Sequence, residues 1–144
     1  MSEPKQNLAN HARYVPAFHF VCLGLIMAFA LHALLSLNQR PSVDGAFQVV
    51  LAFALLLVAW FARAFALTAQ DRLIRLEVSL RVQRLAPELA GRFTQLTTAQ
   101  FTALRFAGDA ELPGLLHEVL DGKLTRGIDI KKRITDWQGD YLRV

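Results

Sequence analysis

The 144-residue sequence contains a single cysteine, Cys22, and has no aspartate or glutamate in either of its two longest apolar segments. One cysteine cannot form a disulfide within the chain, which excludes a small secreted domain held together by disulfides. The sequence also lacks a glycine-rich phosphate loop, a paired-cysteine metal motif and a nucleophile elbow. His117 and Glu118 are adjacent, so on a helix their side chains point about 100° apart and do not form a zinc-protease motif. We therefore expect no enzyme activity, no cofactor and no bound metal.

The hydrophobic residues, 53% of the chain, are concentrated in two segments instead of being spread periodically. Residues 15–37 carry no formal charge over 23 positions, and residues 46–67 carry only Arg63 over 22 positions. A bilayer core of about 30 Å is crossed by about 20 helical residues, so each segment is long enough to span it. The first segment is also longer than the apolar part of a signal peptide, which has about 7–15 residues. The pattern predicts two retained transmembrane helices and not a purely soluble protein.

Positive charges near the predicted spans indicate their orientation. Lys5 and Arg13 precede the first span and four arginines follow the second, whereas the connector between them carries only Arg40 and Asp44. Because Lys and Arg near span ends stay on the cytoplasmic side, both termini should be cytoplasmic. We predict an all-α fold, a transmembrane helical hairpin whose second span continues into a cytoplasmic helix, followed by a small bundle of short helices. Its parts are an N-terminal cytoplasmic segment (residues 1–14), the first span (15–37), a periplasmic connector (38–45), the second span (46–67) and a cytoplasmic helical module (68–144).

Small residues on one face of a membrane helix let two backbones approach closely. The first span has Gly24 and Ala28, and the second has alanines at seven-residue intervals, Ala52, Ala59 and Ala66. These positions predict packing of the two spans within one chain, with a homodimer face as the alternative.

The few polar side chains in the spans do not assemble into a cofactor site. His19 and His32 are thirteen residues apart, about 20 Å along a helix and about 140° around it, so they cannot bind one haem iron together. A symmetric dimer could pair two copies of His19 in a haem or quinone site, but hydrogen bonding at the membrane edge explains this residue without one. Arg63 lies about one turn inside the end of its span, from which its guanidinium can reach the headgroups.

The second span is expected to continue as one helix to Ala86, because no glycine or proline interrupts it and Pro87 follows. This helix has two apolar stripes on nearly opposite faces. One stripe consists of Leu73, Leu76 and Leu80, and the other of Ile74, Val78, Val82 and Leu85. Two stripes predict two packing partners, the later helices of the chain on one side and a second copy or another protein on the other. We assign the intermolecular partner to the stripe of Ile74, Val78, Val82 and Leu85.

The rest of the chain is predicted to form three or four short helices that dock on residues 68–86. Thr97 caps one of them, Asp109 caps the next, and Asp129 begins a last helix with an apolar face of Ile130, Ile134 and Trp137. The basic triplet of this last helix is either a solvated helix end or a contact with lipid or a partner: Lys131, Lys132 and Arg133. The arginines that follow the second span suit anionic lipid headgroups, so we expect no nucleic-acid ligand.

Four segments resemble one known family, namely residues 10–16 (NHARYVP), 70–77 (QDRLIRLE), 104–113 (LRFA and ELP at its two ends) and 131–141 (KK at its start, WQGDY at its end). It is a bacterial family of small two-span membrane proteins known only as a domain of unknown function. The resemblance covers nearly the whole chain and implies a bacterial inner-membrane location, but no activity. Its motifs lie at the predicted cytoplasmic membrane edge, where we expect a polar cluster of His11, Arg13, Tyr14, Asp71, Arg72 and Arg75. In this cluster Asp71 accepts hydrogen bonds from Arg13 or His11; the alternative is a set of independent solvated charges.

Together these features predict a non-enzymatic accessory or scaffold subunit of a larger membrane assembly. It would contact anionic headgroups and either a protein partner or further copies of itself. The alternative function is a small transport or channel component built from several hairpins, which the scarcity of polar residues in the spans disfavours.

Overall fold

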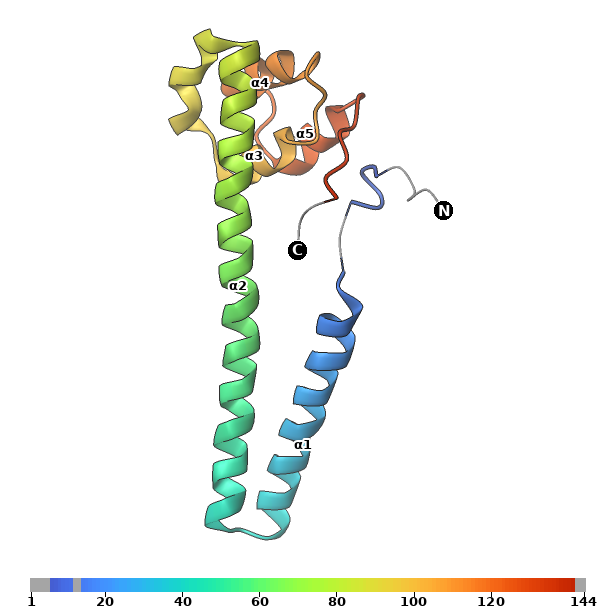
Figure 1. Ribbon diagram of the computed structural model, residues 1–144, viewed down its shortest axis with the longest axis vertical. Helices are drawn as coiled ribbons and strands as arrows, with labels where there is room; N and C mark the ends of the chain where they lie inside the picture. Colours follow the sequence, from blue (N-terminus) through green and yellow to red (C-terminus); the bar gives the residue numbers. More distant parts are fainter. Residues whose placement is uncertain (1–5, 12–13, 142–144) are drawn as a thin grey trace. The chain divides into compact units, whose positions relative to one another are not determined.

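The computed structural model describes residues 6–11 and 14–141, which form helices and one isolated β-bridge between Ala107 and Trp137. Figure 1 shows the helices in chain order: the π-helical η1 (Ala17–Cys22), α1 (Leu23–Gln39), α2 (Val43–Leu85), the 3-10 helix η2 (Pro87–Gln95), α3 (Thr98–Leu104), α4 (Leu112–Leu120) and α5 (Gly127–Arg133). The predicted all-α fold class is confirmed.

The chain divides into two compact units, and α2 supplies residues to both. Residues 14–67 form the first unit, which we call the helix pair. The second unit, which we call the module, combines residues 6–11 with residues 68–141. Of the predicted N-terminal segment, residues 6–11 belong to the module and Tyr14 belongs to the helix pair.

The helix pair consists of η1 and α1 packed against the first part of α2. The small side chains of Ala33, Ala52 and Ala59 are buried, at 0%, 3% and 8% exposure. Gly45 is also buried, and a Cβ at this position would lie 3.1 Å from Cδ1 of Leu37, so the backbones are close here. Small residues therefore line the contact between the two helices, as expected for helices that pack without large interdigitating side chains.

Of the five small residues predicted to pack, three lie on the contact face and two do not. Ala52 and Ala59 are buried and Ala66 is partly buried, whereas Gly24 and Ala28 are exposed. The reason is rotational, because α1 contacts α2 through Ala33, and Gly24 lies nine residues earlier, about 180° around the helix. The assignment of Gly24 and Ala28 to packing within the chain is wrong.

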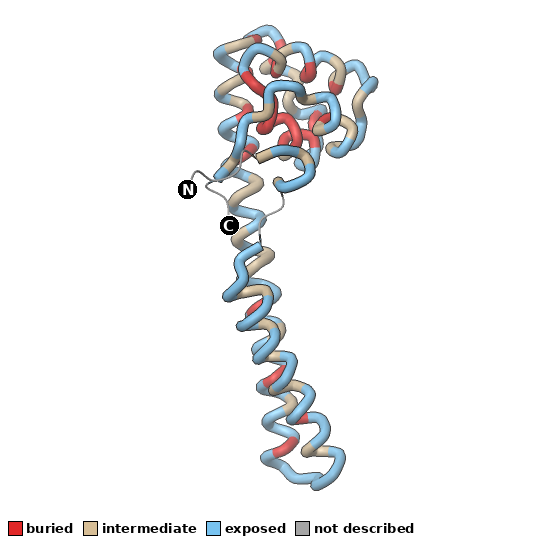
Figure 2. The backbone as a smooth tube through the Cα atoms, turned by 90° about the vertical axis from the view of Figure 1, so that its right-hand side faces the viewer, coloured by how far each residue is buried: buried red, intermediate tan, exposed pale blue. Residues whose placement is uncertain are grey.

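Both helices of the pair are long and apolar enough to cross a membrane, over Ala17–Gln39 and within Val43–Leu85. Their large side chains point outward, with Phe20, Leu25, Phe47 and Trp60 at 67–71% exposure. In Figure 2 the tube of this unit is coloured mostly as exposed, with few buried positions.

The connector between the two helices is short. α1 ends at Gln39 and α2 begins at Val43, so the turn comprises residues 40–42 and includes Pro41. The backbone amide of Arg40 donates to the carbonyl of Ser36, and the hydroxyl of Ser42 accepts from the amide of Gly45, which gives the first turn of α2 a side-chain acceptor. The turn is five residues shorter than the predicted connector, because both helices extend into it.

The module is built on the last part of α2, whose buried stripe contacts the short helices. Ile74, Val78 and Val82 are 3%, 1% and 1% exposed and belong to one core with side chains of α3, α4 and α5, including Phe101, Leu104, Leu112, Leu116 and Ile130. Buried residues gather here in Figure 2. The predicted docking of the tail on the long helix is confirmed.

Two local predictions for the module are confirmed, and the one for its last helix is wrong. α2 ends at Leu85, just before Pro87, and Thr97 caps α3 in a capping box with Gln100. The last helix, however, ends at Arg133, and Trp137 is not helical but pairs with Ala107 in the isolated bridge. Trp137 and Ile130 therefore do not share a helix face.

Candidate functional site

The most exposed apolar surface of the module lies on α2. Leu73, Leu76 and Leu80 are 59%, 55% and 56% exposed, and they are spaced three and four residues apart on one side of the helix. We call these three side chains the leucine face. Polar and charged residues border it, among them Arg72, Glu77 and Gln83, all exposed. A leucine row of this kind on a polar helix is typical of a surface that packs against another helix.

The stripe to which we assigned the intermolecular partner occupies the opposite side of α2 and is the chain's own core. Ile74, Val78 and Val82 are buried against α3, α4 and α5, and Leu85 packs at the edge of the same cluster. The assignment of an intermolecular partner to this stripe is therefore wrong. The sequence correctly indicates two apolar stripes, but both consist of aliphatic side chains, so it does not indicate which of them the tail covers.

A charged contact between Arg81 and Asp109 holds the tail against α2 beside the buried stripe. Arg81 donates from Nε and Nη2 to Oδ1 of Asp109, at 2.9 and 2.7 Å, and from Nη2 to the carbonyl of Ala107 at 2.6 Å. Arg84 donates to the other carboxylate oxygen of Asp109 at 2.7 Å. The hydrogen bond from Arg81 lowers the pKa of Asp109 below its ordinary value, although desolvation acts the other way. Asp109 thus binds α2 and does not cap α4, whose N-cap is Glu111.

Glu111 holds the segment after α5 against the start of α4. Its carboxylate accepts hydrogen bonds from the hydroxyl and amide of Thr135, at 2.7 and 3.0 Å, and from the amide of Asp136 at 3.2 Å. Burial raises the pKa of Glu111, but these hydrogen bonds, with one from the amide of Gly108, outweigh burial and the pKa is lowered.

The segment after α5, which Glu111 holds, contributes Trp137 to an aromatic cluster. The ring of Trp137 stacks on Phe106 with centroids 4.5 Å apart, and Phe106 is fully buried. The guanidinium of Arg105 lies 4.5 Å from the centroid of Phe106, and its Nη1 forms a 3.0 Å ion pair with Asp140. The side chain of Arg105 is only 5% exposed, so this ion pair is largely shielded from solvent.

The N-terminal segment completes the cluster through His11. The Nδ1 of His11 lies 2.7 Å from the carbonyl of Leu8, and its Nε2 lies 3.0 Å from the ammonium of Lys131. Because a carbonyl needs a donor and an ammonium needs an acceptor, these contacts assign His11 as the neutral Nδ1–H tautomer. Its ring also lies 5.7 Å from Phe106 and 5.9 Å from Trp137 in edge-to-face geometry.

The described residues of the polar cluster predicted at the membrane edge belong to different units of the structure. Asp71, Arg72 and Arg75 share a hollow of about 200 Å³ with Thr68 and Thr98, and Arg75 lies 5.2 Å from the ring centroid of Phe101. His11 belongs to the aromatic cluster described above. Tyr14 belongs to the helix pair, where its ring contacts His19, and Arg13 lies outside the described residues.

The predicted basic patch does not form one solvated surface. Lys131 is partly buried, with its ammonium 5.4 Å from the ring centroid of Phe106. Lys132 and Arg133 are exposed, and Nε of Arg133 lies 3.5 Å from the carboxylate of Glu118. Only two of the three residues are therefore at the surface, because Lys131 faces the aromatic cluster.

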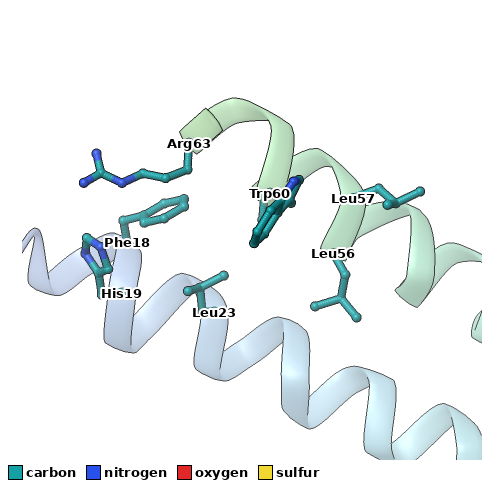
Figure 3. Close-up of a pocket in the computed structure, with 8 residues that line it drawn as sticks. Phe18, His19, Leu23, Leu56, Leu57, Trp60 and Arg63 are labelled. Carbon is teal, nitrogen blue, oxygen red and sulfur yellow. The ribbon is translucent and has the colours of Figure 1, made fainter. Parts of the chain in front are cut away.

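The helix pair contains an apolar groove, shown in Figure 3. Its volume is about 450 Å³, and it is lined by Phe18, His19, Leu23, Leu56, Leu57, Ala59, Trp60 and Arg63. In Figure 3 the guanidinium of Arg63 extends toward the end of the groove at which Phe18 and His19 lie. The imidazole Nδ1 of His19 lies 3.0 Å from the carbonyl of Val15, so the local backbone supplies it with a hydrogen-bonding partner.

A model of one protein family matches residues 1–144. The chain belongs to DUF6526, a family of unknown function. The resemblance inferred from the four motifs is thereby confirmed at the level of the family. No curated protein and no solved structure gives a significant match.

In this DUF6526 member the contacts that sequence reasoning missed are those of Arg81, Glu111, Arg105 and Asp140. Three of the motif segments meet at the aromatic cluster. Residues 104–113 and 131–141 supply its rings and its ion pair, and residues 10–16 supply His11. The signal was therefore present in the motifs, but their spacing along the chain gives no indication of which residues meet.

Proposed function

We propose that this DUF6526 chain is a non-enzymatic integral membrane protein that acts as an accessory or scaffold subunit of a larger assembly in the bacterial inner membrane. In this proposal the helix pair is a transmembrane hairpin, both termini are cytoplasmic, and the module assembles with its partner through the leucine face. The observation that carries the proposal is the exposure of Leu73, Leu76 and Leu80 on a helix whose opposite side is buried.

Membrane insertion is supported by the side chains that the helix pair presents outward. Phe20, Leu25, Phe47 and Trp60 are all at least 67% exposed, and soluble proteins rarely expose apolar surface on this scale. In a bilayer the same side chains meet acyl chains, and the small residues between the helices provide the packing. The arginines after the second span favour a cytoplasmic location of the module, because Lys and Arg near span ends are retained on that side.

Assembly through the leucine face is supported by energetics. Full burial of one leucine stabilises a complex by about 1.5–3 kcal/mol, and three neighbouring leucines provide enough apolar area for a helix of a partner to pack on. The border of charged and polar residues fits the rim of such an interface. Lipid is a poorer occupant, because Glu77 lies beside the leucines and anionic headgroups repel it.

A photo-crosslinking amino acid placed at residue 76 of the full-length chain in its native membrane tests this proposal. We expect one adduct of defined mass from position 76 and none from position 128 on α5, where Ile128 is a comparably exposed apolar residue at 44%. Leu80→Glu should abolish the adduct, since it puts a charge into the interface without disturbing the buried core. Mild-detergent purification then gives the stoichiometry of the partner.

Two outcomes would overturn the proposal. One is the absence of any adduct at position 76, and the other is equal, heterogeneous crosslinking at positions 76 and 128. A homo-oligomer that conducts ions in liposomes would instead replace the subunit role by the transport or channel function.

A further inference from the structure

We propose that the leucine face is covered by the same face of a second copy of this chain, in a parallel two-stranded coiled coil over residues 69–84. In this arrangement Arg72 of each copy pairs with Glu77 of the other. The inference rests on the proposed function, because it names the partner that the leucine face binds.

The first support is the heptad pattern of exposed residues on α2. Leu73 and Leu80 take position a, and Ala69, Leu76 and Gln83 take position d, with spacings of four and three residues throughout. All five are exposed. A row of a and d residues is the seam through which two helices pack as knobs into holes.

The second support is that the chain's own contacts leave this seam open. Val78 takes position f, directly opposite the seam, and Ile74 and Val82 take the adjoining positions b and c. These three are the buried residues that contact the short helices. A second helix on the seam therefore does not displace any part of the module.

The third support is charge complementarity between two copies. Arg72 takes position g and Glu77 takes position e of the next heptad, five residues later. In a parallel pair, g of one helix faces this e of the other, so the two-fold axis generates two Arg72–Glu77 pairs of opposite sign. Both side chains are exposed, and neither forms a salt bridge with any of the described residues, so both are available for a partner. This match is what favours a second copy over an unrelated helix.

The membrane would hold two copies parallel and close to each other. Two copies inserted with the same topology have parallel α2 helices and meet at a high effective concentration. A seam of two heptads, which is marginal for a free peptide in water, becomes sufficient under this constraint. Gln83 at a d position adds a polar pair that helps to fix the register.

Disulfide trapping tests the seam directly. In a Cys22→Ser background the chain has no other cysteine, so a cysteine at Leu76 can only pair with its counterpart in a second copy. In full-length protein reconstituted into liposomes at low density, Leu76→Cys should give mainly disulfide-linked dimer after mild oxidation. Ile128→Cys, which is also exposed but lies outside the seam, should stay mainly monomeric.

Charge reversal tests the register. Arg72→Glu and Glu77→Arg each place like charges in both interhelical pairs and should lower the dimer association constant about tenfold, measured by energy transfer between labelled copies in liposomes. The double variant restores opposite signs and should return the association constant to within about twofold of the unsubstituted chain.

The outcomes separate this inference from the proposed function. A trapped Leu76→Cys dimer with restored affinity in the double variant supports the second copy. A defined adduct at position 76 with a different protein, without any Leu76→Cys dimer, overturns the second copy and leaves the subunit role standing. If the charge reversals leave the dimer association constant unchanged, the parallel register is overturned. If no adduct of any kind forms, both proposals are overturned.

Discussion

The guanidinium of Arg81 binds the carboxylate of Asp109 through two nitrogens, at 2.9 and 2.7 Å, across 28 residues of sequence. The same guanidinium donates to the carbonyl oxygens of Arg105 and Ala107, at 3.2 and 2.6 Å. Arg81 borders the buried stripe of α2, so this contact secures the segment before α4 against that side of the helix. The leucine face, on the opposite side of α2, is exposed.

Replacing Arg81 by methionine should destabilise the module. The substitution keeps the apolar stem but leaves two carbonyl groups and part of Asp109 without their donor, which we expect to lower the free energy of unfolding by about 1–2 kcal/mol. Arg84→Met is the matched control, because Arg84 is 67% exposed and donates a single hydrogen bond to Asp109, from Nη2. Its effect should stay below about 0.5 kcal/mol. Denaturation followed by the fluorescence of Trp137 in a Trp60→Phe background measures the free energy of unfolding of both variants. Equal losses in the two variants would contradict a special role of Arg81 in holding the module together.

Glu111 should make the module sensitive to acid. Burial raises its pKa, but the hydrogen bonds from Thr135, Asp136 and Gly108 outweigh burial and hold the pKa below the ordinary value of 4.5. A carboxylate with a lowered folded-state pKa contributes stability above its unfolded pKa, and this contribution is lost as the pH falls through the folded value. Asp109 contributes in the same direction, below its ordinary value of 3.8.

Glu111→Gln therefore should be less stable than the unsubstituted chain at pH 7 and should lose less stability between pH 6 and pH 3. The measurement is the midpoint of unfolding as a function of pH in both proteins. Glu88→Gln is the control, since Glu88 is exposed on η2, and its profile should follow that of the unsubstituted chain. An acid transition that is unchanged in Glu111→Gln would show that other carboxylates cause it.

Local signals in the sequence were sufficient for most of the helices. Pro87 stops α2, which ends at Leu85, and the side chain of Thr97 caps α3. Both signals were readable because they act within a few residues of the helix end. The two apolar stripes of α2 were also visible, because helical periodicity alone separates Leu76 from Val78.

The arrangement of the site depended on contacts that no local signal encodes. Trp137 has the right spacing to extend the face of Ile130 and Ile134, but stacking on Phe106, 31 residues earlier, competes with the helix and prevails. Lys131 likewise belongs to a basic triplet in the sequence, yet its ammonium approaches His11, 120 residues away. Pairings over such separations are set by the packing of the whole module, so the sequence of one chain leaves them open.

The packing of the helix pair should depend on the small side chain of Ala52. Ala52 is 3% exposed where α2 meets α1, whereas Ala54, two residues later, is exposed. Leucine at position 52 must push the helices apart and should destabilise the pair by about 1–3 kcal/mol. Leucine at position 54 adds the same atoms on the outer surface and should cost less than about 0.5 kcal/mol. Thermal unfolding followed by Trp60 fluorescence in a Trp137→Phe background compares the two, because Trp60 lines the groove between the helices. If Ala52→Leu melts at the same temperature as Ala54→Leu, the close contact at Ala52 does not hold the helices together.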